Sequence, residues 1–145
     1  MANCSERGRG STVRTENVLD EFARAKKSLA AARLLLSSSL FEDAVSRSYY
    51  AVMHATKAAL LVHDVIADSH ARVRRLFGSV LVRPGLVEKE WAAVLGREQD
   101  KRAVADYAVG TAWNSEDVSR LVEDAAAFVQ RIRDFLRSAG VMIEE

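Results

Sequence analysis

Arg47 and His54 are the residues of this sequence whose types and spacing best fit chemistry on a phosphate ester. They are seven residues apart, and at about 100° per residue this spacing places both side chains on one face of a helix, with α-carbons about 10 Å apart along its axis. Histidine exchanges protons near neutral pH, and arginine keeps its charge and binds two phosphate oxygens at once. The pair therefore predicts a site that holds a phosphate and moves a proton.

Metal-free cleavage of RNA needs these two functions. A 2′-hydroxyl must lose a proton, charge on phosphorus must be stabilised, and the leaving oxygen must gain a proton. One histidine supplies one of the two proton transfers, so a homodimer with a second Arg–His pair across its interface would complete the site. The same stripe also holds Tyr50, Ala51, Lys57 and Ala58, and the alternative is that it is only the solvated face of a long helix.

The elements that must position these residues are all predicted to be helices. Apolar residues recur at helical spacing, Pro84 is the only proline, and no stretch alternates as a strand would. The predicted helices cover residues 15–37, 41–63, 70–82, 87–107 and 114–137, with caps at Thr15, at Asp68 or Ser69, and at Asn114 or Ser115. We expect an all-α fold, a compact antiparallel bundle of four to five helices. It forms one domain over 15–138, between a flexible arm, 1–14, and a tail, 139–145.

Composition limits the classes of function. The chain has 145 residues, a net charge of +1 and a single cysteine, Cys4, which fits a reducing compartment. No apolar run is long enough to be a secretory signal or to span a bilayer, so we expect a cytoplasmic protein without membrane contact. No His, Cys or acidic residues have convincing metal-ligand spacing, and we expect no metal and no cofactor. Any contact with nucleic acid needs a local basic patch.

The segment after Asp68 is the locally basic stretch, and it carries Arg72, Arg74, Arg75 and Arg83 without an acid. It is predicted to contact RNA phosphates, with a solvated helix face as the alternative.

Two other histidines have different expectations. His70 lies in the first turn of its helix and either belongs to the cap or reaches the Arg47 stripe. His63 falls about 180° from His54 around the helix and is expected to be a buried or edge residue.

A resemblance to a known family begins with the stretch from Ser46 to Leu61, SRSYYAVMHATKAALL. It resembles the signature helix of HEPN-domain proteins, most closely the small prokaryotic chains with an Arg-x-Tyr-Tyr-Ala-x-x-His pattern. Three further segments fit that group in order: Asp68-Ser69-His70 with Leu76-Phe77-Gly78, then Arg102 to Tyr107, then Ala125 to Leu136.

The resemblance implies a helical bundle, often dimeric, and either of two functions. One is a metal-independent ribonuclease of toxin–antitoxin type, in which Arg47 and His54 match the hallmark arginine and histidine. In that case we expect Tyr50 and Lys57 of the same stripe to support them, together with His70 if it reaches the stripe. The other is a non-catalytic module that binds a nucleotide, RNA or a partner. The implied partner is a minimal nucleotidyltransferase acting as antitoxin. The resemblance also suggests that Asp106 and Tyr107 hold the fourth helix on the bundle, where the residues alone suggest a surface Arg102–Asp106 pair.

Overall fold

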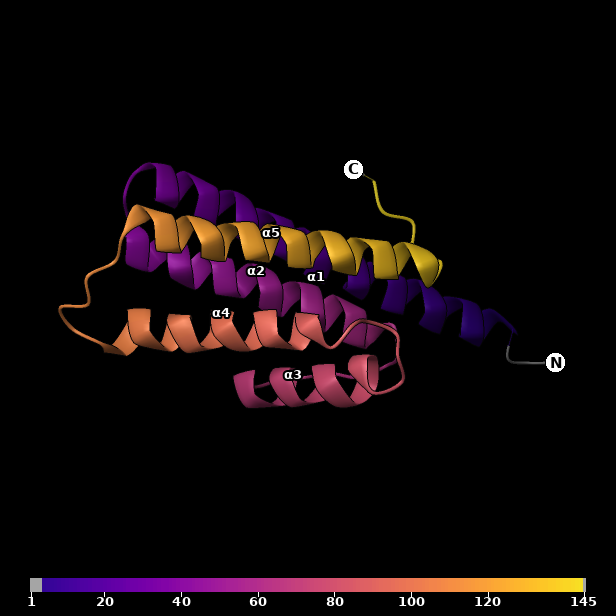
Figure 1. The fold of residues 1–145 in the computed structure, drawn as a ribbon. Helices are drawn as coiled ribbons and strands as arrows, with labels where there is room; N and C mark the ends of the chain where they lie inside the picture. The colour runs from indigo at the N-terminus through magenta and orange to yellow at the C-terminus, as the bar shows by residue number, and fades with distance from the viewer. Residues whose placement is uncertain (1–3, 145) are drawn as a thin grey trace.

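The central helix of the protein is the one that carries Arg47 and His54. The computed structural model describes residues 4–144, with side chains from residue 14 onward. Its elements, in chain order, are α1 (Cys4–Ser37), α2 (Phe41–Leu61), α3 (His70–Leu76), the π-helix η1 (Phe77–Val82), α4 (Glu90–Tyr107) and α5 (Ser115–Ser138). α2 packs against all the others, and α1, α4 and α5 surround it (Figure 1). The all-α bundle is confirmed, and the described residues contain no strand.

The core explains why α2 is central. Its alanines at 44, 51, 55, 58 and 59 are all fully buried, and their small side chains let neighbouring helices approach closely. Larger apolar side chains from the other elements fill the remaining space, among them Phe22, Phe77 and Phe128. Because the bundle covers α2 on most sides, only a narrow stripe of this helix faces outward.

Two predicted caps are confirmed and fix the ends of their helices. The Ser69 side chain accepts a hydrogen bond from the Arg72 backbone N–H at the start of α3. The Asn114 side chain accepts one from the Asp117 N–H at the start of α5. The helix predicted over 70–82 is present, but it consists of α3 followed without a break by η1. The turns of η1 are wider than those of an α-helix, and the Arg83 N–H donates to the Gly78 carbonyl.

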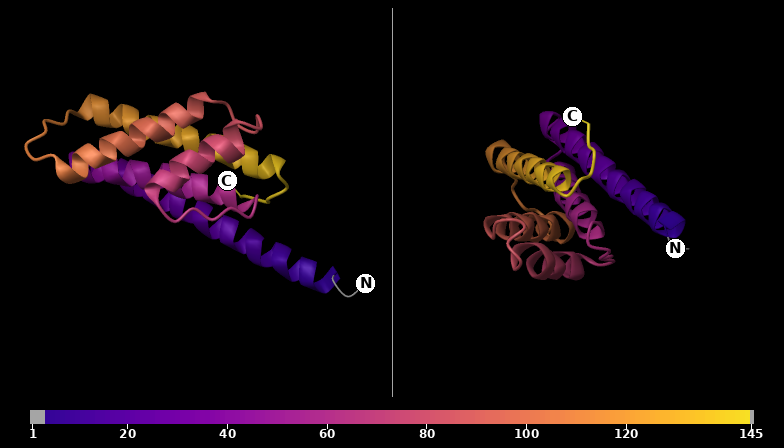
Figure 2. Two further views of the ribbon diagram at one scale, coloured as in Figure 1. Left: turned by 90° about the horizontal axis from the view of Figure 1, so that it is seen from below. Right: turned by 90° about the vertical axis from the view of Figure 1, so that its right-hand side faces the viewer.

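The helix predicted to start at Thr15 starts earlier. α1 begins at Cys4, and its N-terminal part extends beyond the other helices (Figure 2). Gly8 and Gly10 weaken a helix but, unlike proline, they leave its hydrogen bonds intact. The division into an arm, a domain and a tail stays a prediction.

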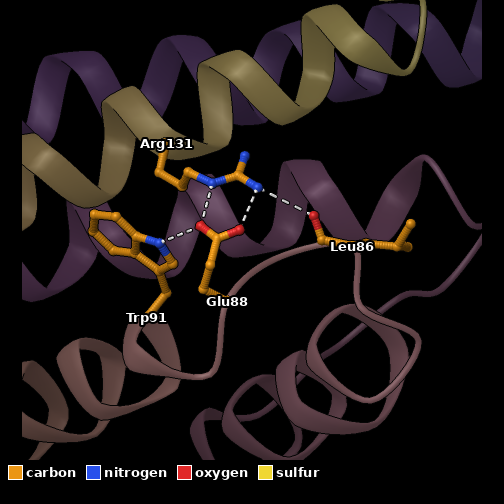
Figure 3. A network of polar contacts seen from close by, with 4 residues as sticks. All are labelled: Leu86, Glu88, Trp91 and Arg131. Atoms are coloured by element: carbon orange, nitrogen blue, oxygen red, sulfur yellow. Dashed lines mark hydrogen bonds and ion pairs between the residues drawn. The ribbon is translucent and has the colours of Figure 1, made fainter.

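α4 begins at Glu90 rather than at Val87, because Glu88 is held outside the helix (Figure 3). Its carboxylate accepts hydrogen bonds from Arg131 Nε and Nη2 at 2.8 and 3.0 Å and from Trp91 Nε1 at 3.0 Å. Arg131 also donates to the Leu86 carbonyl. Hydrogen bonds from Arg131 and Trp91 lower the pKa of Glu88 to about 2. This contact ties the segment before α4 to α5.

Candidate active site on α2

The outward stripe of α2 is polar, and it contains the predicted pair. Arg47 is exposed, and Ser46, Tyr50, His54 and Lys57 are half-buried. Ala51 and Ala58, predicted to share this stripe, are fully buried. At about 100° per residue, Ala51 and Ala58 are rotated around the helix from Arg47 in the direction opposite to Tyr50. This rotation is enough to direct their side chains into the bundle.

His54 is held by a residue of α1. Its Nδ1 lies 2.7 Å from Glu21 Oε2, and both side chains are mostly buried, at 16% and 20% exposed. The hydrogen bond with His54 lowers the pKa of Glu21, with help from the charges of Lys57 and Arg24 and against the effect of burial. An ionised carboxylate can only accept, so Nδ1 carries the proton.

This contact determines what His54 can do. With Nδ1–H bonded to Glu21, the second ring nitrogen, Nε2, is the one available to take or give a proton, and it has no hydrogen-bond partner among side chains 14–144. A carboxylate that fixes the tautomer and the ring orientation is the arrangement expected of a general base.

Arg47 stands two turns before His54, and no bond joins the two. Its guanidinium makes no ion pair or hydrogen bond with residues 14–144 and therefore has its donors free. The Tyr50 ring lies between them along the helix, with its centroid 6.3 Å from that of His54. The stripe thus offers an arginine, a tyrosine hydroxyl, a histidine and a lysine to one ligand.

Arg102 of α4 borders this stripe. It forms a 2.7 Å ion pair with Asp106, and its guanidinium carbon lies 5.8 Å from the ring centroids of both Tyr49 and Tyr50. Asp106 accepts a hydrogen bond from Ser46 at 3.1 Å, so this pair does connect α4 to α2. Tyr107 takes no part in that connection, because it is 78% exposed.

His70 contacts α2 through a different residue. The Tyr49 hydroxyl lies 2.6 Å from His70 Nδ1. Burial raises the pKa of Tyr49 to about 12, so the hydroxyl donates. Burial, followed by the charges of Arg102 and Lys57, lowers the pKa of His70, and Asp106 opposes this. The charge of Lys57 therefore acts both on Glu21, the partner of His54, and on His70.

The predicted basic segment is partly neutralised by its surroundings. Arg72 lies 3.8 Å from Asp68, and Arg74 lies 3.3 Å from Asp100 of α4. The Arg74 guanidinium also packs over Gly96, where an added Cβ would come within 2.7 Å of it. Arg75 is exposed without an ion pair in the described residues. The role of this segment in RNA binding stays a prediction.

The remaining histidine, His63, packs against α5. His63 is exposed and stacks on Phe135 with centroids 6.2 Å apart, which makes it an edge residue as expected. Within residues 4–144, no three His, Cys, Asp or Glu side chains are grouped as metal ligands would be. No helix in this range has the length and apolar character to cross a membrane.

Glu21 is the site residue that sequence reasoning missed, although its position gave a signal. It falls three residues after Val18 and four before Ala25, both of which are buried. A charged residue at that spacing faces the bundle and needs a polar partner there. His54 on the neighbouring helix is that partner.

Comparison with known proteins agrees with the resemblance. The family model described as HEPN domain matches residues 18–135. A protein of Methanocaldococcus jannaschii with the name "Putative toxin" is 33% identical over 113 residues, which cover 78% of this chain and 84% of that protein. A UPF0332 protein of Gloeobacter violaceus is 34% identical over 118 residues, covering 81% and 94%. A second M. jannaschii "Putative toxin" is 25% identical over 119 residues, covering 82% and 81%.

Proposed function

The chain belongs to the HEPN domain family, and from that premise we propose that it is a metal-independent RNA endonuclease whose site is the Arg47–His54 stripe of α2. One observation carries the proposal: Glu21 binds His54 Nδ1 at 2.7 Å and leaves Nε2 available on a stripe that also holds an unpaired arginine. A merely solvated face would not require a mostly buried carboxylate behind its histidine.

The reaction follows from these groups. Nε2 of His54 takes the proton of an RNA 2′-hydroxyl, and the 2′-oxygen forms a bond to the adjacent phosphorus. The bond from phosphorus to the 5′-oxygen breaks, and that oxygen takes up a proton. The products are a 2′,3′-cyclic phosphate and a 5′-hydroxyl. Arg47 binds the non-bridging oxygens, whose negative charge increases in the transition state.

The second proton transfer needs a second group. A homodimer that places two α2 stripes side by side would supply it from His54 of the second copy. In such a dimer one histidine would act as base and the other as acid, as general acid–base catalysis requires. We therefore include the homodimer in the proposal.

The names of two relatives support a toxin-like role. Both M. jannaschii proteins bear the word toxin. We propose that RNA cleavage by this chain is restrained by a partner that acts as antitoxin, and that a minimal nucleotidyltransferase is that partner. Covering the exposed Arg47 would be sufficient for inhibition, because phosphate could then no longer reach the stripe.

The test is cleavage of labelled RNA by the purified chain in EDTA. Cleavage should persist in EDTA and leave 2′,3′-cyclic phosphate ends, detectable by resistance of the 3′ end to ligation and to periodate. Arg47→Ala should lower the rate about 100- to 1000-fold, as loss of a transition-state donor does. Arg47→Lys keeps the charge but loses the bidentate geometry, so its cleavage rate should lie between those of the wild type and Arg47→Ala.

Two results would overturn the proposal. Activity that disappears with EDTA and survives Arg47→Ala would reject the mechanism. A purified chain that binds RNA or a nucleotide but cleaves none of a varied set of RNAs would identify it as the non-catalytic binding module.

A further inference from the structure

The part of α1 that follows Glu21 is basic and free of acids. From Phe22 to Phe41 the sequence contains Arg24, Lys26, Lys27 and Arg33, and no aspartate or glutamate. All four side chains are exposed, and none forms an ion pair within residues 14–144. In a chain with a net charge of only +1 this is a concentrated local excess of positive charge.

These residues lead away from His54 around α1. At about 100° per residue, Arg24 lies about 60° from Glu21 around the helix, and Lys27 lies about 60° further in the same direction. Arg24 is close enough to Glu21 to lower its pKa electrostatically. Cations therefore begin beside the Glu21–His54 pair and continue over the outer face of α1.

On the other side of α1 the cations reach a groove between α1 and α5. It is a cavity of about 270 Å³ whose charged lining residues are Lys26, Arg33 and Arg133, with no acid among them. Its floor is apolar, with Leu29, Ala126 and Val129. Arg133 donates to the neutral Gln130 Oε1 at 3.0 Å and lies 5.6 Å above the Phe22 ring. The nearest carboxylate in this network is Asp134, which binds Gln130 rather than a cation of the groove.

We infer that this basic track, made of Arg24, Lys27, Lys26, Arg33 and Arg133, binds the phosphodiester backbone of the RNA strand that enters the α2 site. The inference rests on the proposed nuclease function. Phosphate is the ligand that fits, because the positive charges of these side chains are not neutralised by carboxylate partners and the groove lining contains no acid that would repel an anion. α1 is about 10–12 Å thick, so a single strand can pass over it and contact both the α2 stripe and the groove.

The experiment measures RNA binding in a His54→Ala background, so that the probe stays intact. Fluorescence anisotropy with a labelled oligouridine is recorded at several KCl concentrations. Lys26→Gln combined with Arg33→Gln removes two cations of the track and avoids Arg133, which packs on the core. Arg97→Gln combined with Arg120→Gln is the matched control, because these exposed arginines already have carboxylate partners, Asp124 and Glu116.

The track variant should bind about tenfold more weakly, with a salt slope smaller by about 1.4, as expected for two lost contacts to a single strand. The control should change affinity less than about twofold. Thermal unfolding of each variant verifies that the fold is kept. Equal weakening by both pairs, or no change with the track pair, would overturn the inference. The inference would also be overturned if oligoglutamate bound as tightly as RNA and lost its affinity in the same way when Lys26 and Arg33 are replaced.

The two proposals fail separately. If the protein with His54 restored cleaves RNA and the track pair changes neither binding nor cleavage, the track is rejected and the nuclease stands. If it cleaves nothing but binding still depends on the track, the nuclease is rejected, and the track is a phosphate-binding surface of a non-catalytic module.

Discussion

Two glutamates contact α2 from different helices, and their surroundings drive their pKa values in opposite directions. Glu21 of α1 meets His54, and the hydrogen bond to it lowers the pKa of Glu21. Glu98 of α4 is fully buried and meets Ser48 at 2.9 Å, and burial raises its pKa to about 8, with a smaller contribution from the charge of Asp124. Burial raises the pKa of both glutamates, so the hydrogen-bond partner decides whether the pKa ends below or above its ordinary value.

The hydrogen bonds around Glu98 fit a neutral carboxyl group. Ser48 Oγ lies 2.9 Å from Glu98 Oε2 and 3.1 Å from the Leu121 carbonyl, yet its hydroxyl has one proton to donate. If Glu98 is protonated, its O–H donates to Ser48 and Ser48 donates to Leu121, and each group has a partner. Glu98 Oε1 has no hydrogen-bond partner in the described residues, which also disfavours a charge there.

The difference separates two uses of a buried acid. Glu98 joins α2, α4 and α5 and stays neutral, so its role is structural. Glu21 stays ionised because its carboxylate is hydrogen-bonded to His54 of the outward stripe, so its role extends to the surface that we propose as the active site. Variants of these residues and of their neighbours test this division.

The largest effect is expected from His54→Ala. Cleavage should fall between about 100- and 10,000-fold, the usual contribution of a general acid–base group. The pKa of Glu21 should rise, since its main partner is gone and burial remains. Side-chain carboxyl NMR titration measures the second effect, with Glu98 as the internal reference that does not move. A Glu21 pKa that stayed low without His54 would show that Lys57 and Arg24 are sufficient to hold its charge.

Glu98→Gln should change how stability depends on pH. Between pH 4.5 and about 8 the folded chain keeps the Glu98 proton while the unfolded chain loses it, so the free energy of unfolding falls as pH rises through this window. The full loss is at most about 5 kcal/mol above pH 8. Glutamine has no proton to lose, so the variant should be the more stable protein at pH 8.

Urea denaturation at pH 5, 6.5 and 8 measures this difference. Asp124→Asn is a useful comparison, because removing the neighbouring charge should lower the pKa of Glu98 and weaken the pH dependence only in part. Parallel pH curves for wild type and Glu98→Gln would mean that Glu98 is ionised in the fold.

Glu21→Gln should reduce cleavage by about 10- to 100-fold, the cost typical of removing a group that orients a catalytic ligand or base. Glutamine can still accept from Nδ1–H, but without the negative charge. The control is Glu16→Gln, because Glu16 is an exposed acid of the same helix whose side chain makes no hydrogen bond or ion pair with the described residues of α2. If Glu21→Gln and Glu16→Gln both cleave at the wild-type rate, the negative charge of Glu21 does not contribute to the reaction.

The sequence predicted the stripe better than its surroundings. Arg47 and His54 could be placed on one face because helical periodicity is local and α2 has no breaker. Their surroundings could not be predicted in this way. Glu21 contacts His54 and Glu98 contacts Ser48, but both glutamates come from other helices, and these contacts depend on how the bundle packs. Ala51 and Ala58 were misplaced for a similar reason: small residues near the edge of a stripe turn inward only when a neighbour covers them. The late start of α4 is also a tertiary effect, because Arg131 of α5 holds Glu88 outside the helix.

The smallest effect is expected from Tyr49, which like Glu98 is buried and has a raised pKa, here about 12. Its hydroxyl is hydrogen-bonded to His70. Tyr49→Phe removes one hydrogen bond and should cost about 1 kcal/mol of the free energy of unfolding. The raised pKa adds no pH dependence near neutrality, since the hydroxyl is protonated in both states there.

His70 does add a pH dependence near neutrality. Its lowered pKa means that the folded chain binds a proton less readily than the unfolded chain below about pH 6.5, so the contribution of His70 to stability falls as the pH is lowered. His70→Gln keeps an acceptor for Tyr49 and removes this titration. The raised pKa of Glu98 makes the fold more stable at pH 5 than at pH 7, and His70 opposes this gain, so urea denaturation at the two pH values should show a larger gain for His70→Gln than for the wild type. An unchanged gain in His70→Gln would mean that His70 binds a proton equally well in the folded and the unfolded chain.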